Sequence, residues 1–200
     1  MKKIILTVAA VLVLSFANAQ DKKASGFGYA KGDIVLGGNI MTSSSTTDNG
    51  TTSVKSSSSM IGPDVAYFIS DNLALELGLA IGSTKVGSAK TATSNVAVGA
   101  RYYFLNLGER FKTYTNFGLN FGSNDNGGNG ATKTSTLGVG AGIGMNYFLT
   151  SNVAINFGLG NIISYNSSTT GSAKTSGMDI NLNEFNNFFS KPTFGVSYKF

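Results

Sequence analysis

The sequence predicts an all-β protein, an eight-stranded antiparallel up-and-down β-barrel that spans a membrane. Three observations predict it. Apolar residues alternate with small or polar ones over stretches of about ten residues, short connections alternate with long ones, and charged residues make up only 12% of the chain. Alternation with a period of two is typical of a strand whose two faces meet different surroundings. No stretch after residue 19 has the period of an amphipathic helix.

The first nineteen residues have the features of a cleavable signal peptide. Lys2 and Lys3 form a basic start, residues 4–16 are mostly apolar, and Ala17-Asn18-Ala19 is a small-residue cleavage site. A membrane anchor is the alternative, but it needs roughly 20 apolar residues and this stretch is shorter. We therefore expect export with cleavage after Ala19, a short periplasmic segment over 20–31, and the barrel over 32–200.

Eight strands follow from the alternation. We predict them over 32–42, 57–69, 73–83, 92–104, 112–122, 133–148, 153–165 and 191–200. The connections over 70–72, 105–111 and 149–152 are short, whereas those over 43–56, 84–91, 123–132 and 166–190 are longer and mostly polar. Short turns on one side and long loops on the other are the layout of a bacterial outer-membrane barrel, which would put both termini in the periplasm.

The connection over 166–190 is the longest of all. Residues 179–182 could extend the last hairpin beyond the membrane, and the segment 183–189 contains Phe185, Phe188 and Phe189. A short helix, a lid over the barrel and an apolar contact surface are all compatible with this segment.

An internal repeat divides the predicted barrel into halves. Residues 67–79 match residues 147–159, at an offset of 80 residues that spans four strands. The second and third strands therefore correspond to the sixth and seventh, half a barrel apart.

The placement of charge distinguishes a membrane barrel from a soluble β-sandwich, because both alternate. A sandwich needs bulky side chains in its core, but here the less apolar face consists of Gly, Ala, Asn, Thr and a few charges, which suits a narrow polar lumen. Lys133 is an exception at a loop-side end. The other strand charges share the less apolar face: Asp33, Asp64, Glu76, Arg101, Lys112 and Lys199. A charge on the lipid face costs roughly 2–4 kcal/mol at mid-membrane, so this segregation favours the barrel.

Aromatic residues gather where strands run toward the short turns. Side chains with an apolar body and a polar tip favour the membrane interface. We therefore predict a periplasmic aromatic belt of Tyr67, Phe68, Tyr102, Phe104, Tyr147, Phe148, Tyr198 and Phe200.

The composition excludes most catalytic chemistry. Without His and Cys the chain cannot build a Ser-His-Asp triad, a Cys-His dyad or a His/Cys zinc site. A carboxylate-only glycosidase remains formally open, but acids are few. Removal of Lys2 and Lys3 lowers the net charge from +5 to +3, with no basic cluster for nucleic acid. We expect no enzyme, no cofactor, no metal and no nucleic-acid partner.

The sharpest candidate site is a charged pair inside the barrel. Glu76 and Arg101 fall on neighbouring strands and both point inward by alternation. A gate or a solute contact is one interpretation. The favoured one is an interior network that stabilises the fold, because an eight-stranded barrel is just wide enough for its own side chains. The predicted network comprises Asp64, Glu76, Arg101, Lys112, Tyr114, Asn116 and Asn156.

Three segments resemble small outer-membrane β-barrel proteins of the OmpX, OmpW and OmpA-barrel kind. They are Tyr67-Phe68-Ile69-Ser70-Asp71-Asn72 with Pro63 upstream, Ala100-Arg101-Tyr102-Tyr103-Phe104, and Phe194-Gly195-Val196-Ser197-Tyr198-Lys199-Phe200. The last is similar to the signature that the barrel-assembly machinery reads, carried by Phe194, Val196, Tyr198 and Phe200. The chain has no Trp, which is common in the belts of such barrels.

The resemblance implies a monomeric barrel in the outer membrane. Its expected partners are the surrounding lipid and the barrel-assembly machinery, which would bind the C-terminal strand. The first functional hypothesis is a structural or surface-interaction role through the extracellular loops. The second is a narrow OmpW-like conduit for small molecules, apolar ones included. A soluble exported β-sandwich adhesin is the third.

Overall fold

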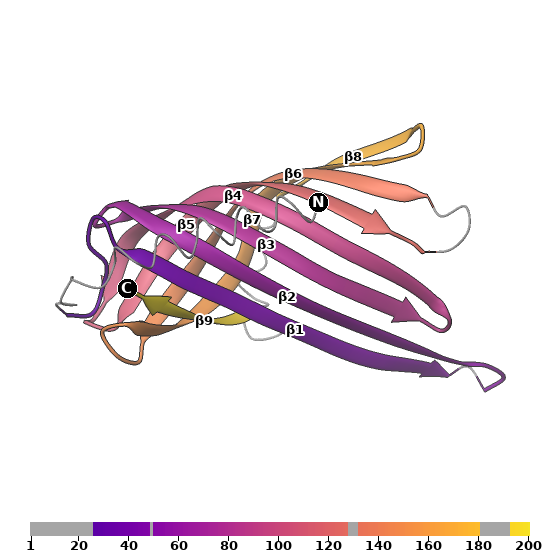
Figure 1. Cartoon of the computed structure of the whole chain (residues 1–200), viewed down its shortest axis with the longest axis horizontal. Coiled ribbons are helices and arrows are strands. Elements are labelled where there is room, and N and C mark those ends of the chain that lie inside the picture. Colours follow the sequence, from indigo (N-terminus) through magenta and orange to yellow (C-terminus); the bar gives the residue numbers. More distant parts are fainter. Residues whose placement is uncertain (1–25, 49, 128–131, 181–192) are drawn as a thin grey trace.

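In a computed structural model of the chain, one antiparallel sheet closes on itself to form a barrel (Figure 1). The structure describes residues 26–48, 50–127, 132–180 and 193–200. The predicted signal peptide, its cleavage site after Ala19 and the Phe-rich segment 183–189 therefore lie outside the described residues. No helix in the described ranges is long and apolar enough to cross a membrane.

Within the described residues, nine strand segments fill the eight positions around the barrel. They are β1 (Ile34–Asp48), β2 (Ser53–Ser70), β3 (Leu73–Val86), β4 (Ala89–Leu107), β5 (Phe111–Asp125), β6 (Lys133–Phe148), β7 (Val153–Thr170), β8 (Ala173–Ile180) and β9 (Thr193–Lys199). Consecutive strands pair from β1 to β7, and β9 lies between β7 and β1 and closes the ring. β8 pairs with the outer part of β7. The predicted eight-stranded up-and-down barrel is confirmed, with its eighth position divided between β8 and β9.

The two ends of the barrel differ. We call the end with the turns 71–72, 108–110 and 149–152 the short-turn end, and the opposite end, with the hairpin tips 87–88 and 171–172 and the outer ends of β1, β2, β5 and β6, the long-hairpin end. Both the first strand's start and the last strand's end lie at the short-turn end, where Val35 pairs with Lys199. The structure has one closed sheet, whereas a β-sandwich needs two packed sheets, so the alternative prediction of a soluble β-sandwich is wrong.

The strands extend further than the alternation predicted. β1 and β2 stay in register as far as the pair Asp48 and Ser53, so most of the predicted loop 43–56 is strand. The same holds for 84–91 and for 166–180, where β8 confirms the predicted extension of the last hairpin as far as Ile180. The main-chain ladder does not require apolar side chains, and hydroxyl pairs such as Ser58 with Thr84, 3.1 Å apart, add cross-strand contacts.

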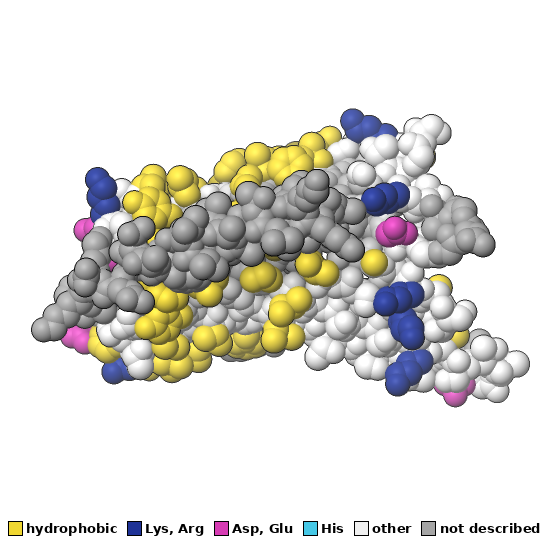
Figure 2. Space-filling model, viewed as in Figure 1, with side chains coloured by type: hydrophobic (Ala, Val, Ile, Leu, Met, Phe, Trp, Pro, Cys, Tyr) yellow, Lys and Arg dark blue, Asp and Glu magenta, His cyan; other side chains and the backbone are white. Residues whose placement is uncertain are grey.

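The outer face of the barrel is apolar and the inner face is small or polar. On β3 and β4 the outward residues include Leu75, Ile81 and Val98, while Gly78 and Gly99 occupy positions on the inner face. On the face seen in Figure 2, hydrophobic side chains gather from near the short-turn end to the middle of the molecule, and the long-hairpin end is mostly free of them. Asp33 and Lys199 are buried at the inner face, as the segregation of charge predicted.

The internal repeat corresponds to two equivalent hairpins, β2–β3 and β6–β7. Phe68 and Phe148 occupy matching places, and both point into the barrel with 1% and 0% of their surface exposed. Ala74 and Ala154, which also match, are buried next to the turns. The repeat therefore sets an interior feature of the barrel as well as its outer pattern.

Inward glycines make room for the larger interior side chains. A Cβ on Gly144 would collide with the ring of Tyr114 and lie 2.8 Å from the carbonyl oxygen of Phe157.

We expect Gly144→Ala to lower the stability of the folded barrel by about 1–3 kcal/mol through overpacking. Urea unfolding of the refolded protein, followed by the heat-dependent shift on SDS gels, measures it. Gly177→Ala, where nothing lies within 4 Å, is the control and should be neutral; equal effects of both would contradict the overpacking.

Candidate functional site in the barrel interior

Glu76 and Arg101 meet inside the barrel as the sequence predicted. Arg101 on β4 pairs in register with Ala74 on β3, which brings Arg101 beside Glu76 two residues along. Arg101 Nη2 lies 2.5 Å from Glu76 Oε1, and their side chains are 14% and 17% exposed. The Arg101 guanidinium also stacks over the ring of Tyr114, 4.3 Å from its centroid. The cation is thus held by a carboxylate and an aromatic face.

Hydrogen bonds continue from this pair toward the short-turn end. Arg101 Nη1 donates to the hydroxyl of Tyr103 at 3.3 Å. Asn146 Nδ2 donates to the same hydroxyl at 3.2 Å and to the hydroxyl of Tyr29 at 2.5 Å. Asn146 is fully buried, so this amide links the wall of the barrel to Tyr29. We call Glu76, Arg101, Tyr103, Asn146 and Tyr29 the interior chain.

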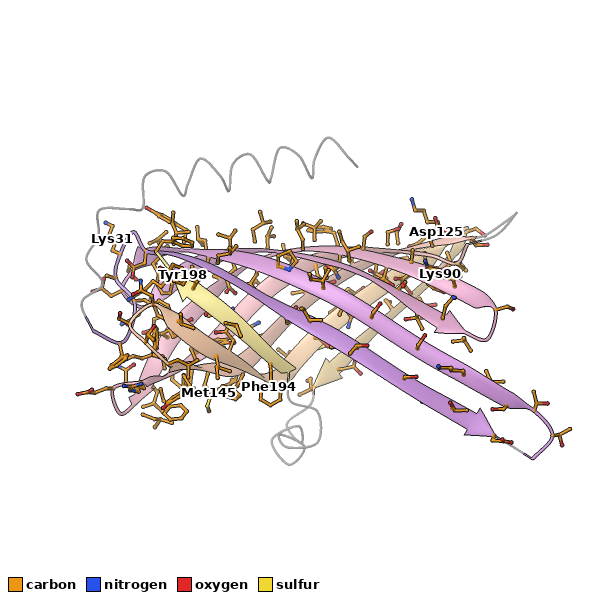
Figure 3. All side chains as sticks on the ribbon, turned by 60° about the horizontal axis from the view of Figure 1, so that its bottom comes forward. Lys31, Lys90, Asp125, Met145, Phe194 and Tyr198 are labelled. Carbon is orange, nitrogen blue, oxygen red and sulfur yellow. The ribbon has the colours of Figure 1, made fainter. Side chains whose placement is uncertain are left out.

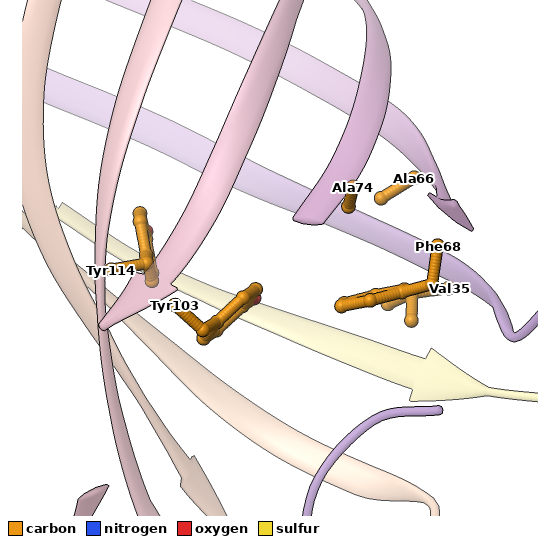
Figure 4. Close-up of a cluster of buried hydrophobic side chains, with 6 residues drawn as sticks. All are labelled: Val35, Ala66, Phe68, Ala74, Tyr103 and Tyr114. Carbon is orange, nitrogen blue, oxygen red and sulfur yellow. The ribbon is translucent and has the colours of Figure 1, made fainter. Parts of the chain in front are cut away.

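Tyr29 belongs to the segment before β1 and closes the short-turn end from inside. Its ring stacks on Phe68 with centroids 4.2 Å apart, and it contacts Tyr103 at 4.8 Å and Phe148 at 5.2 Å. Figure 4 shows the wall residues of this cluster, with Phe68, Tyr103 and Tyr114 pointing into the barrel. Burial raises the pKa of the Tyr29 phenol, so the hydroxyl stays neutral and available for hydrogen bonding.

Further contacts hold the segment in place, and we call residues 27–29 the plug. The Arg110 guanidinium lies 4.3 Å from the centre of the Phe27 ring. Lys199 Nζ donates to the carbonyl of Gly28 at 2.6 Å and lies 3.9 Å from Asp33. The backbone of Gly28 has φ +140°, a region that favours glycine.

The plug lies within the segment 20–31 that the sequence predicts to be periplasmic, and that prediction stays untested. The described part, 26–31, enters the end of the barrel because its two aromatic rings find interior partners there. Alternation could not predict this, since the segment is too short to show a period.

The other predicted network residues all face the interior, but at different levels. Asn156 Oδ1 accepts a hydrogen bond from Ser197 at 3.0 Å, and Lys112 lies beside Gly28 of the plug. Asn116 pairs in register with Arg101 on the neighbouring strand. Asp64 lies nearer the long-hairpin end. The predicted set is therefore several local groups rather than one network.

A hollow of about 360 Å³ lies above the charged pair, toward the long-hairpin end. Arg101 and Tyr114 form its floor, and Asp64 contributes to its wall. Four amide side chains also line it: Asn39, Asn95, Asn120 and Asn156. The interior is thus a hollow lined by amide and charged side chains together with apolar ones such as Met60 and Ala80, and the interior chain and the plug close it at the short-turn end.

The predicted aromatic belt is partly wrong. Phe68 and Phe148 lie inside the barrel, because each is adjacent in sequence to an outward Tyr and neighbours on a strand point to opposite faces. The outward members are Tyr67, Tyr102, Phe104 and Tyr198, which are about half exposed. Tyr147 packs on Phe111, and Phe200 packs on Tyr198.

The chemistry of this interior is one of holding groups in place. Within the described residues, no three His, Cys, Asp or Glu side chains come together to hold a metal. The charged pair is mutually neutralised, and the phenols and amide beyond it serve as hydrogen-bond partners.

Sequence reasoning missed Tyr29, Tyr103 and Asn146 as members of the site. Alternation does place Tyr103 on the face of Arg101 and Asn146 on the inward face of β6, so both carried a signal. Tyr29 carried none.

A family model and a solved structure with a TM-score above 0.5 agree with the barrel fold. The family model described as "Outer membrane protein beta-barrel domain" matches residues 6–200. A comparison with curated protein sequences finds no match. Among solved structures, the outer membrane protein OprG from Pseudomonas aeruginosa is similar, with 18% identity, coverage of 86% of this chain and 98% of that one, and a TM-score of 0.52. Outer Membrane Protein W of E. coli has 18% identity, coverages of 86% and 99%, and a TM-score of 0.47.

If the charged pair is structural, Glu76→Gln will destabilise the barrel because Arg101 then stays buried without its carboxylate. We expect the free energy of unfolding to fall by about 3 kcal/mol, which is the lower end of the range for a buried ion pair that loses one partner. Urea unfolding of the refolded barrel measures it. Addition of Arg101→Met should recover part of the loss, and Glu109→Gln, in an exposed turn, serves as the control. An unchanged unfolding midpoint for Glu76→Gln would contradict a structural role.

Proposed function

The chain belongs to the outer-membrane protein β-barrel domain family. From this premise we propose that it is a non-enzymatic barrel with a structural or surface-interaction role, in which its outer hairpins make the contacts outside the cell. The closed interior is the observation that carries the proposal. Tyr29 is wedged between Phe68 and Phe148, and the Glu76–Arg101 pair fills the lumen above it.

The dimensions of the outer face support a membrane-spanning role. The outward face of β5 runs from Phe111 to Phe121, about 33 Å along the strand and about 25 Å across the membrane at the usual strand tilt. That is the height of the apolar band in outer-membrane barrels. Beyond it the strands continue as polar hairpins, which are free to meet other surfaces.

Orientation and assembly follow from the same layout. The proposed orientation has the short-turn end in the periplasm and the long-hairpin end outside the cell. The outward series Phe194, Val196 and Tyr198 on β9, followed by Phe200, is the proposed signal for the assembly machinery. The mature protein is proposed to be a monomer that has lost residues 1–19.

A narrow conduit for small molecules is the second candidate. The hollow of about 360 Å³ favours it, because a solute could enter from the long-hairpin end. Passage would also require the plug to leave. Tyr29 is part of a segment outside the strands, so its departure would not break the ladder.

Planar-bilayer recording separates the two candidates. The structural role predicts that the refolded wild type produces no discrete open events, because the interior chain and the plug block the lumen at the short-turn end. Tyr29→Ala removes the ring at the centre of the plug, and Tyr165→Ala, on the outer face of β7, is the matched control. Open events in the wild type that become more frequent in Tyr29→Ala, but not in Tyr165→Ala, would contradict the structural role and favour the conduit.

A further inference from the structure

Three lysines gather on the outer face of neighbouring strands at the long-hairpin end. Lys85 on β3 and Lys90 on β4 are direct cross-strand partners. Lys55 lies on β2 beside the same hairpin, where its carbonyl accepts a hydrogen bond from Gly87. All three are exposed. Figure 2 shows basic side chains gathered beyond the hydrophobic band, over the outer parts of these strands. We call Lys55, Lys85 and Lys90 the lysine patch.

The patch points toward the membrane side rather than the lumen. Lys85 has the parity of the outward residues Leu75 and Ile81 on its strand, and Lys90 has that of Val96 and Val98. The alternate residues face inward, as the hydroxyl contact between Ser58 and Thr84 illustrates. The lysines therefore stand on the same face as the apolar band.

The height of the patch above the apolar band is short. On β3 the outward series reads Ile81, Ser83, Lys85. Residues two apart on one face of a strand are about 6.6 Å apart, so Lys85 lies about 13 Å along the strand from the last apolar side chain. At the usual strand tilt this is about 10 Å along the membrane normal, whereas the headgroup region is about 5–7 Å deep on each side. The backbones of Lys85 and of its cross-strand partner Lys90 thus lie just beyond the headgroups, and their long side chains can extend back toward the lipid phosphates.

The charges of the patch are not neutralised by the protein. Like charges directly across a strand pair are destabilising, and Lys85 faces Lys90. In the part of the chain that the structure describes, no lysine of the patch has a carboxylate within ion-pair distance. Asp48 and Asp125 flank the patch only diagonally, and Asp125 directly faces Lys133 (Lys90 and Asp125 are seen in Figure 3). Diagonal neighbours are about 7–8 Å apart.

We propose that the lysine patch binds the phosphorylated headgroup of an outer-leaflet glycolipid that lies against β2 to β4. Lysine is a common phosphate binder, and three cations just beyond the lipid-facing apolar band match a lipid whose headgroup presents phosphate there. A soluble phosphate would not need the position directly above an apolar band. The proposal rests on the proposed orientation, but not on whether the lumen conducts.

Co-purification with lipid A tests this proposal. The full chain, refolded in phosphatidylcholine vesicles containing bis-phosphorylated or fully dephosphorylated lipid A, is extracted in detergent and its retained lipid is counted by native mass spectrometry. The wild type should retain the phosphorylated form preferentially. Lys85→Ser with Lys90→Ser should weaken that retention about 30-fold, from the usual contribution of a lysine at an anionic surface. Lys85→Arg with Lys90→Arg should preserve it.

A second double variant distinguishes binding at the lysine patch from a general effect of positive charge at this end of the barrel. Lys133→Ser with Lys174→Ser removes the same charge from the same end, but Lys133 faces Asp125 and Lys174 faces Thr169. It should keep most of the retention. Equal losses in the two variants, or equal retention of both lipid forms by the wild type, would overturn the proposal. The heat-dependent gel shift checks that each variant is folded, and the two-lipid comparison on the wild type decides the matter even if a variant fails to fold.

Discussion

Closure of the hydrogen-bonded ladder is the constraint on which the other features of this protein depend. In lipid every backbone donor and acceptor must be paired within the protein, and an open sheet edge has no partner there. Here the ring is closed by the short strand β9, which pairs with β7 on one side and β1 on the other, and by the bond from Phe200 N to Ile34 O. Eight positions give a narrow barrel, so the interior accepts only side chains that are small or matched to one another.

The interior chain is a response to that narrowness. A charge in such a lumen needs a partner, and Arg101 has Glu76, Tyr114 and Tyr103. The next space is filled by Asn146 and Tyr29 rather than by a further strand residue. The plug precedes the first strand and is not part of the barrel wall. Its packing therefore closes one end of the barrel and leaves the other hollow, and the closure requires no additional strand and no shift of strand register.

Alternation in the sequence was sufficient to predict the faces of the strands, the pairing of Glu76 with Arg101 and the equivalence of the two hairpins. These features depend on parity alone. Strand ends were predicted less well, since the polar residues beyond the apolar band carry no alternation although their backbones remain paired. The aromatic character of Phe68 and Phe148 favours the outer belt, whereas their parity places them on the inner face, where the structure has them. Tyr29 could not be predicted, because its position depends on rings brought together only by closure.

The two matching hairpins also bear on how such a barrel could arise. β2–β3 and β6–β7 have similar sequences over a stretch of thirteen residues at an offset of 80 residues, and Phe68 and Phe148 both contact the ring of Tyr29. A gene segment encoding four strands, copied once in tandem, gives this arrangement directly. Such a half is an open sheet with two unsatisfied edges, so it would be stable in a membrane only as a pair of copies. Fusion of the copies into one chain fixes that pairing, and afterwards each half is free to diverge, as the division of the last position between β8 and β9 illustrates.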